Sequence, residues 1–311
     1  MIKYNTPQEL FTAICDKIRD KTNSNELINH QDIPDKIDNL VDSDIINEYN
    51  ELLSIIINQD TIIQLNNNEI ENINISFNDC TNLTTIDLPK CTSINRYTFN
   101  NCTNLTTVSL PECTSIGYGA FYSCTNLTTV SFPKCTSIGG YAFNNCASLT
   151  TIDLPECIVI DSGPHYTVGT IHCLNLTTIN LPKCISIKNN VFCKCTSLTT
   201  INLPKCTSIG EYAFYECTSL TTVNLPECTS IGSYAFVNCN LQIIILGADQ
   251  IVGINSFTFK YEPSINNGTG YIYVPDNLVD SYKSDTNWST YANQIKPLSE
   301  LPSELKEEYN L

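Results

Sequence analysis

The sequence predicts an α/β solenoid of stacked 22-residue coils with parallel strands on one face. Three observations predict it. A phrase that begins NLTTIDLPKCTSINRYTFNNC at Asn82 returns nearly unchanged along the chain. Cysteines fall every 11 residues from Cys80 to Cys157, and again from Cys173 to Cys239. Apolar residues keep fixed places in each copy, and a fixed period of this size is the signature of a stacked-repeat fold.

Within each coil, one segment has the pattern of a half-buried strand. In the first coil, Ile86 and Leu88 alternate with Thr85 and Asp87, which is the two-residue period of a strand with one buried side. Pro89 ends this strand because proline has no N–H to donate to a neighbouring strand. The Ser-Ile-Gly segment that follows can form a second short strand or a turn.

The spacing of the apolar residues is that of a leucine-rich repeat. From Leu83 to Cys91 the chain fits the pattern L-x-x-L-x-L-x-x-C. A longer phrase with an Ala-Phe pair runs over residues 127–146 and returns over 198–217. On these motifs the chain resembles the BspA-like (Treponema pallidum type) leucine-rich repeat family over roughly residues 80–295. The resemblance implies a leucine-rich repeat solenoid and a role in surface adhesion or interaction.

The chain divides into three parts. Residues 1–45 have apolar residues at helical spacing and are expected to form a helical module that caps the first coil, since a solenoid needs capped ends. This stretch is similar to a short module of phage-tail-like and surface proteins of Firmicutes. Residues 46–260 are expected to form the solenoid, with regular coils over 80–238 and an insertion at 161–172. Residues 261–311 are expected to form a strand-helix cap, with Trp288 in its packing.

The cysteines are expected to be buried and reduced. Coils stack about 4.8 Å apart with nearly parallel side chains, whereas a disulfide needs Cβ atoms roughly 3.5–4.5 Å apart. The total of 17 cysteines is also odd. A zinc site is an alternative, because His172-Cys173 precedes Cys193-Lys194-Cys195 by one coil and His165 lies in the insertion. The spacing is wrong for zinc, so no metal and no cofactor is expected.

Composition excludes several classes of function. The net charge is −16, and residues 80–238 carry 8 acidic against 7 basic side chains, so no basic face for nucleic acid is expected. No apolar run is long enough to span a membrane. The N-terminus lacks an apolar signal core, which on sequence favours the cytoplasm, whereas the family resemblance favours a cell surface or particle. Three histidines without a partnered nucleophile or a phosphate-binding motif indicate no enzyme.

Binding to a protein or cell-surface ligand is therefore the favoured function, with the oligomeric state open. The outward strand positions are Thr85, Asp87, Thr107, Thr129, Thr151, Asp153, Thr178, Asn180, Thr200, Asn202, Thr222 and Asn224. The insertion adds His165 and Tyr166, since insertions in repeats often map to a binding face. Two other interpretations stay open. The strand face can be a solvated surface without a partner, and the protein can be a structural spacer, for example in a phage-like particle.

Overall fold

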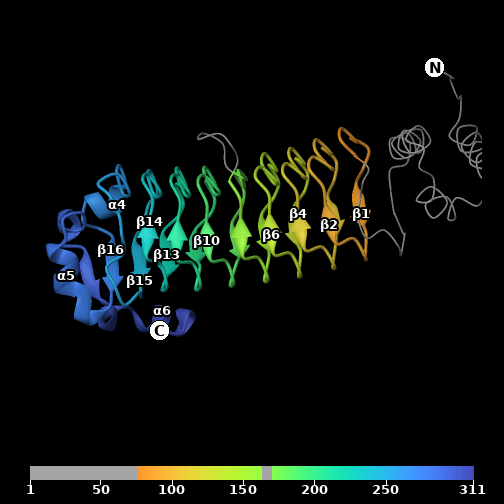
Figure 1. The fold of residues 1–311 in the computed structure, drawn as a ribbon. Helices are drawn as coiled ribbons and strands as arrows, with labels where there is room; N and C mark the ends of the chain where they lie inside the picture. Colours follow the sequence, from red (N-terminus) through yellow and green to blue (C-terminus); the bar gives the residue numbers. More distant parts are fainter. Residues whose placement is uncertain (1–75, 163–169) are drawn as a thin grey trace, which may run out of the picture.

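The computed structural model describes residues 76–162 and 170–311. The expected N-terminal cap, the coils before residue 76, and His165 and Tyr166 lie outside the described residues. The described coils stack into a rod, with the C-terminal segments gathered at one end (Figure 1). The predicted leucine-rich repeat solenoid is confirmed.

Each coil contributes two strands on adjoining sides of the rod, and on each side the strands of neighbouring coils run parallel to one another. The long-strand face is built from β1 (Thr85–Asp87), β3 (Thr107–Ser109), β5 (Thr129–Ser131), β7 (Thr151–Asp153), β9 (Thr178–Asn180), β11 (Thr200–Asn202) and β13 (Thr222–Leu225). The short-strand face is built from β2 (Ser93–Ile94), β4 (Ser115–Ile116), β6 (Ser137–Ile138), β8 (Val159–Ile160), β10 (Ser186–Ile187), β12 (Ser208–Ile209) and β14 (Ser230–Ile231). The short strands form one seven-stranded sheet. The Ser-Ile segments are therefore strands rather than turns.

Where strands pair, equivalent residues of successive coils lie opposite one another, although the long strands fall into three sheets with breaks between β3 and β5 and between β9 and β11. Thr129 pairs with Thr151 and Thr151 with Thr178, so each side-chain type forms a column along the rod. Along the long-strand face, β11 and β13 continue into β15 (Ile243–Leu246), β16 (Tyr271–Val274) and β17 (Ile295–Pro297). The pairing holds across the insertion, because β7 pairs directly with β9 and β8 with β10.

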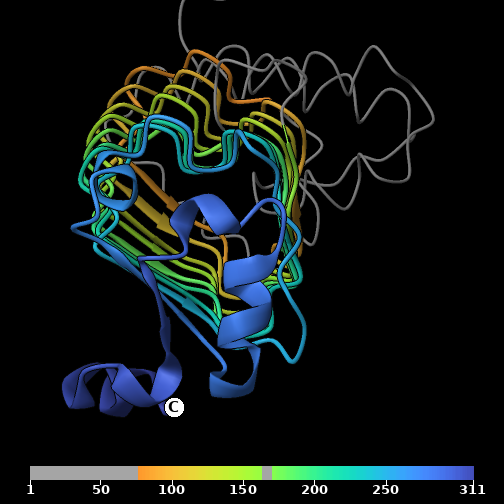
Figure 2. The same ribbon diagram turned by 90° about the vertical axis from the view of Figure 1, so that its left-hand side faces the viewer.

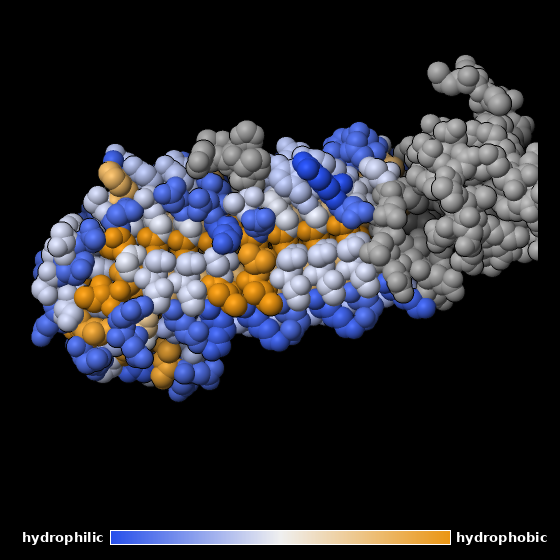
Figure 3. All heavy atoms as spheres, in the orientation of Figure 1, coloured by the Kyte–Doolittle hydropathy of each residue, from blue (hydrophilic) through white to orange (hydrophobic). Residues whose placement is uncertain are grey.

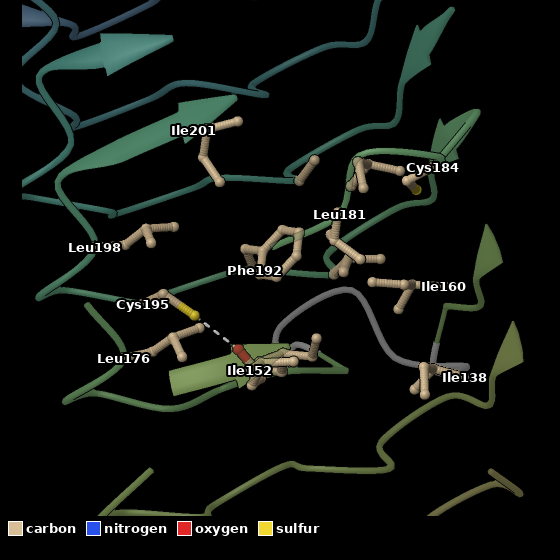
Figure 4. Packing of buried hydrophobic residues seen from close by; sticks show 14 of the residues in the cluster. Ile138, Ile152, Ile160, Leu176, Leu181, Cys184, Phe192, Cys195, Leu198 and Ile201 are labelled. Carbon is tan, nitrogen blue, oxygen red and sulfur yellow. Dashed lines mark hydrogen bonds between the residues drawn. The ribbon is translucent and has the colours of Figure 1, made fainter. Parts of the chain in front are cut away.

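The core is a set of stacked columns of identical apolar side chains. Phenylalanines of successive coils stack face to face, with ring centroids 5.5 Å apart for Phe121 and Phe143 and 5.3 Å apart for Phe192 and Phe214. In the coil with the insertion, buried Ile171 replaces the ring. Figure 4 shows leucines and isoleucines from neighbouring coils around Phe192. A coil cannot bury this face by itself, so the repeat is needed for stability.

The cysteine thiols form hydrogen bonds to backbone carbonyls at two corners of every coil. From Cys102 onward, one column donates to a carbonyl of the preceding coil; Cys195, for example, donates to Ile171 O at 2.7 Å (Figure 4). The second column donates within its own coil, as Cys91 does to Ser93 O at 3.2 Å. All 16 described cysteines are buried, and none of them forms a disulfide. The expectation of buried cysteines in two columns is thus confirmed for the described residues, whereas their reduced state stays a prediction.

The C-terminal cap closes the end of the core. It contains α4 (Pro263–Asn266), η1 (Asp276–Leu278), α5 (Val279–Ser284), η2 (Ser289–Tyr291), η3 (Leu298–Glu300) and α6 (Ser303–Tyr309). Trp288 is fully buried, and its indole N–H donates to Val252 O at 2.8 Å. Its ring lies 5.9 Å from Phe259, the last ring of the phenylalanine column. Figure 2 shows the cap helices across the end of the stacked coils, as the expected strand-helix cap requires.

Candidate functional site

The long-strand face brings together the predicted strand residues in two columns. The first column holds Thr85, Thr107, Thr129, Thr151, Thr178, Thr200 and Thr222. The second holds Asp87, Ser109, Ser131, Asp153, Asn180, Asn202 and Asn224. Their side chains are exposed or half-buried, with Asn224 as the exception. Buried Ile and Val residues between the columns hold the strands flat.

The side chains of the second column largely satisfy one another. Ser131 Oγ donates to Asp153 Oδ2 at 3.0 Å, and Asn180 Nδ2 donates to Asp153 Oδ1 at 2.7 Å. Asn224 Nδ2 donates to Asn202 Oδ1 at 2.9 Å. These bonds cross from coil to coil, so this column is a preformed network that leaves few groups for a partner.

The first column differs, because most of its hydroxyls have no partner in the described part of the chain. Thr107 lies 3.5 Å from Thr106 Oγ1. The hydroxyls that make no hydrogen bond to another described residue are those of Thr85, Thr129, Thr151, Thr178, Thr200 and Thr222. The face therefore presents a row of free donors and acceptors at one-coil spacing, about 4.8 Å.

Helix α6 limits this face at its C-terminal end. Ile243 and Ile245 pair with Thr222 and Asn224, so they occupy outward positions of the same columns. Ile245 is buried with Tyr273 and Leu301 in a small cluster that includes residues of α6. Asn224 is only 2% exposed, which corrects the expectation that it faces solvent. Its Oδ1 is buried without a hydrogen-bond partner among the described residues.

The edge between the two strand faces carries alternating charges. Lys134 pairs with Glu112 at 2.5 Å, and Lys183 pairs with Glu156 at 2.6 Å. All of these side chains are roughly half-exposed, so each pair contributes about 0.2–1 kcal/mol at most. These ion pairs help to fix the register of neighbouring coils and do not by themselves indicate a binding site.

The short-strand face carries an exposed apolar patch that the sequence analysis did not single out. Most coils place threonine before the short strand, and Thr136 Oγ1, for example, donates to Thr114 O at 3.1 Å. Ile158 and Ile185 replace threonine in two neighbouring coils and are 45% and 48% exposed. Figure 3 shows hydrophobic residues at the middle of this face, next to a hydrophobic row that runs along the rod. In the sequence, this patch is indicated by the two positions at which isoleucine interrupts the column of threonines.

A shallow hollow of about 580 Å³ lies between the last coil and the cap. Tyr261, Asn267, Thr290 and Tyr291 are among its lining residues. Tyr261 is 66% exposed, the highest value among the large apolar side chains described. Lys260 and Glu262 also line the hollow, and the Glu262 carboxylate accepts hydrogen bonds from the backbone N–H groups of Leu241 and Ile265.

Comparison with known proteins identifies the repeat. The chain matches the BspA type leucine rich repeat region, in six copies, over residues 57–162 and 185–278. The protein belongs to the BspA-type leucine-rich repeat family. Members of this family are typically protein-interaction or adhesion modules and generally non-enzymatic scaffolds. The comparison with curated proteins found no match.

Solved structures similar to this BspA-type chain include two leucine-rich repeat proteins and a vaccine antigen. A leucine-rich repeat protein from Bacteroides ovatus is 21% identical, with 71% of this chain and 62% of that chain covered and a TM-score of 0.49. The T. pallidum leucine-rich repeat protein is 21% identical, and the match covers 57% of this chain and 75% of that chain with a TM-score of 0.40. The pneumococcal vaccine antigen PcpA is 15% identical, and the match covers 71% of this chain and 68% of that chain with a TM-score of 0.43.

Other candidate sites in this BspA-type protein gain no support. No described group of three or more His, Cys, Asp or Glu residues is arranged to hold a metal ion. Burial, and secondarily the charge of Lys194, lowers the pKa of His172. Burial raises the pKa of Cys193 to about 11, so this thiol stays protonated at neutral pH. None of the helices in residues 76–162 and 170–311 has the length and hydropathy to cross a membrane.

Proposed function

We propose that this protein is a non-enzymatic recognition module whose long-strand face binds a protein or cell-surface ligand. The observation that supports the proposal is the row of unpartnered threonine hydroxyls from Thr129 to Thr222. Each hydroxyl can donate and accept, and parallel pairing holds Thr129, Thr151 and Thr178 in one sheet and Thr200 and Thr222 in the next. Binding to a preorganised surface loses little conformational entropy, which favours affinity.

The charges on this face suggest the chemistry of the partner. Asp87 and Asp153 are the only ionisable residues of the two columns, and both are acidic. Asp153 already accepts two hydrogen bonds, whereas the Asp87 carboxylate has no hydrogen-bond or ion-pair partner within the described residues. A partner with hydroxyl or amide groups along its surface, and a basic side chain near Asp87, fits this arrangement best.

The test is to block the threonine row with bulky charged side chains. The variant Thr129→Arg/Thr151→Arg/Thr178→Arg is compared with the wild type for binding to a panel of purified cell-surface proteins by surface plasmon resonance. These side chains point to solvent, so the melting temperature is expected to change little while binding falls by about tenfold or more. A control with the same added charge, Thr218→Arg/Ser219→Arg/Ser256→Arg, places arginine at exposed positions elsewhere. Equal binding by both variants would contradict the proposal.

The alternative is a structural spacer, because stacking alone explains most of the regularity of the repeat. Protease treatment of intact source cells, compared with a lysate, separates the two. Loss of the protein from intact cells supports adhesion at the surface. Full protection favours an internal scaffold, and deletion of residues 1–45 then tests whether that segment attaches it.

A further inference from the structure

The apolar patch on the short-strand face lies in two adjacent coils. We define the central patch as Ile158, Val159 and Ile185. Val159 pairs with Ser186 in the strand ladder, and the Ile185 N–H donates to Ile158 O at 3.0 Å. Threonine stands in place of the two isoleucines in the other coils of this sheet, and serine in place of Val159. The repeat itself therefore does not require these apolar side chains.

Two unpaired charges flank the central patch in the same two coils. Asp161 and Lys188 directly follow Ile160 and Ile187, and both side chains are exposed. The other coils have Asn95, Gly117, Gly139, Gly210 and Gly232 in this column. Neither Asp161 nor Lys188 forms an ion pair within the described part of the chain. The column thus carries charge only beside the patch.

We propose that the central patch binds a second copy of this chain. The two rods lie face to face and antiparallel, related by a two-fold axis parallel to the short strands. Ile158 then packs on Ile185 of the second copy, and Asp161 lies opposite Lys188 of the second copy. Each contact occurs twice, as an isologous interface requires. This inference goes beyond the proposed function, because the long-strand face takes no part in it.

The charges select this orientation of the two copies. In the antiparallel arrangement Glu156 faces Lys183 of the second copy, so all four charged positions around the patch meet opposite charges. An axis along the rod would instead place Glu156 opposite Asp161 and Lys183 opposite Lys188. Like charges in contact disfavour that arrangement by several kcal/mol.

The outer coils permit the same arrangement. Lys134 faces Lys205 of the second copy, but each of these lysines is already paired at 2.5 Å, with Glu112 and Glu227 respectively. The glycines that take the place of Asp161 in several other coils leave that edge of the face free of side chains. The threonines there direct their hydroxyls to backbone carbonyls, as Thr207 does to Ile185 O at 3.2 Å.

The size of the face fits a moderate interface. Seven short strands at about 4.8 Å spacing give a length of roughly 30 Å, and the six residues from Glu156 to Asp161 give a width of about 20 Å. This is roughly 600 Å² per copy, somewhat below the ~800 Å² of a standard interface. The long-strand faces of both copies stay open, so a dimer would present two binding faces and gain avidity.

Sedimentation velocity of the full chain, from micromolar to submillimolar concentration, tests the dimer. The wild type is expected to shift from monomer to dimer in this range. Ile158→Thr/Ile185→Thr introduces the residue that other coils carry, so the fold and melting temperature are retained. Loss of the paired isoleucine contacts is expected to weaken association by about tenfold or more. A wild type that stays monomeric, or a double variant that associates equally well, would overturn the proposal.

A charge swap tests the orientation. Lys188→Asp and Asp161→Lys each place like charges across the interface and are expected to weaken the dimer. The double variant Asp161→Lys/Lys188→Asp restores opposite charges and is expected to regain wild-type association. Thr129→Arg, on the long-strand face, serves as a control that leaves the dimer unchanged. A double variant weaker than both single variants would overturn the antiparallel arrangement.

Discussion

The carboxylate of Glu262 accepts a hydrogen bond from the backbone N–H of Leu241 at 2.6 Å. In a regular coil the equivalent N–H donates to a cysteine carbonyl three residues earlier, as Leu105 does to Cys102 O. Leu241 follows Cys239 by two residues instead of three, so its N–H does not form the equivalent bond. Glu262 stands one coil beyond Cys239, at the end of the cysteine column, and supplies the missing acceptor. It also accepts from the Ile265 N–H at 2.5 Å and so caps α4.

Burial of Glu262 makes part of the stability depend on pH. Desolvation raises its pKa from 4.5 to about 6, although its backbone hydrogen bonds oppose the rise. The folded state thus binds this proton more tightly than the unfolded state. The stabilisation is complete below the unfolded pKa and is lost as pH rises through about 6, with a total of about 2 kcal/mol. This pH-dependent stabilisation is measured by urea unfolding of the wild type and of Glu262→Gln at pH values from below 4.5 to above about 6.

The comparison of these two proteins isolates Glu262 from other titrating groups. His172 contributes in the opposite direction, since its lowered pKa makes the folded state more stable as pH rises towards the unfolded value. That contribution is common to both proteins and cancels in the difference. Glu211→Gln, at an exposed position, is the control and is expected to follow the wild type. An unchanged pH slope in Glu262→Gln would contradict the assignment.

Removal of a thiol from the first cysteine column is expected to destabilise the solenoid. Cys195→Ala deletes the hydrogen bond to Ile171 O and leaves a small void in a fully buried corner. The expected loss is about 1–3 kcal/mol in the free energy of unfolding. Ser197→Ala, two positions later and half-exposed, removes a hydroxyl that has no partner among the described residues and is expected to cost less than about 0.5 kcal/mol. Equal losses in the two variants would show that the thiol is dispensable.

The described thiols are expected to be inert in the folded protein. Burial raises the pKa of Cys135 to about 11 and that of Cys184 to about 12, so these two thiols form little thiolate at neutral pH. Reaction with a chromogenic disulfide reagent is expected to be negligible until the protein unfolds. The variant Cys15→Ser removes the remaining thiol, which lies outside the described residues. Rapid reaction of several thiols in native Cys15→Ser would contradict this expectation.

The sequence was sufficient for the parts of the fold that depend on local pattern. Alternation around Ile86 predicted the long strands, and the need to cover the last coil predicted the burial of Trp288. The burial of Asn224 could not be predicted, because Leu301 and Leu305, which pack in the cluster of its strand neighbour Ile245, come about 80 residues later in the chain. The central patch was visible only as two exceptions in a threonine column. Its meaning required the stacking that places Ile158 beside Ile185 and Asp161 beside Lys188.

Replacement of Asn224 is expected to stabilise the protein. Its Oδ1 is buried without a partner, beside the strand that carries Ile245, and an unsatisfied buried polar atom costs about 1–3 kcal/mol. Asn224→Leu removes that cost and adds apolar contact. The amide of Asn202 loses one hydrogen bond, but it is exposed and can bind water. A rise in the free energy of unfolding of about 1 kcal/mol is expected by urea denaturation.

The matched control for Asn224→Leu is Asn202→Leu, one coil earlier in the same column. Asn202 is exposed, so its replacement is expected to change stability by no more than about 0.5 kcal/mol. Ligand binding offers a second contrast, because Asn224 is shielded whereas Thr151 is open to a partner. Asn224→Leu should therefore leave binding at the long-strand face intact. A fall in stability for Asn224→Leu would contradict this prediction. It would mean that the Asn224 amide oxygen is hydrogen-bonded in solution, and that the packing of Ile245 and Leu301 covers this end of the face less tightly than in the structure.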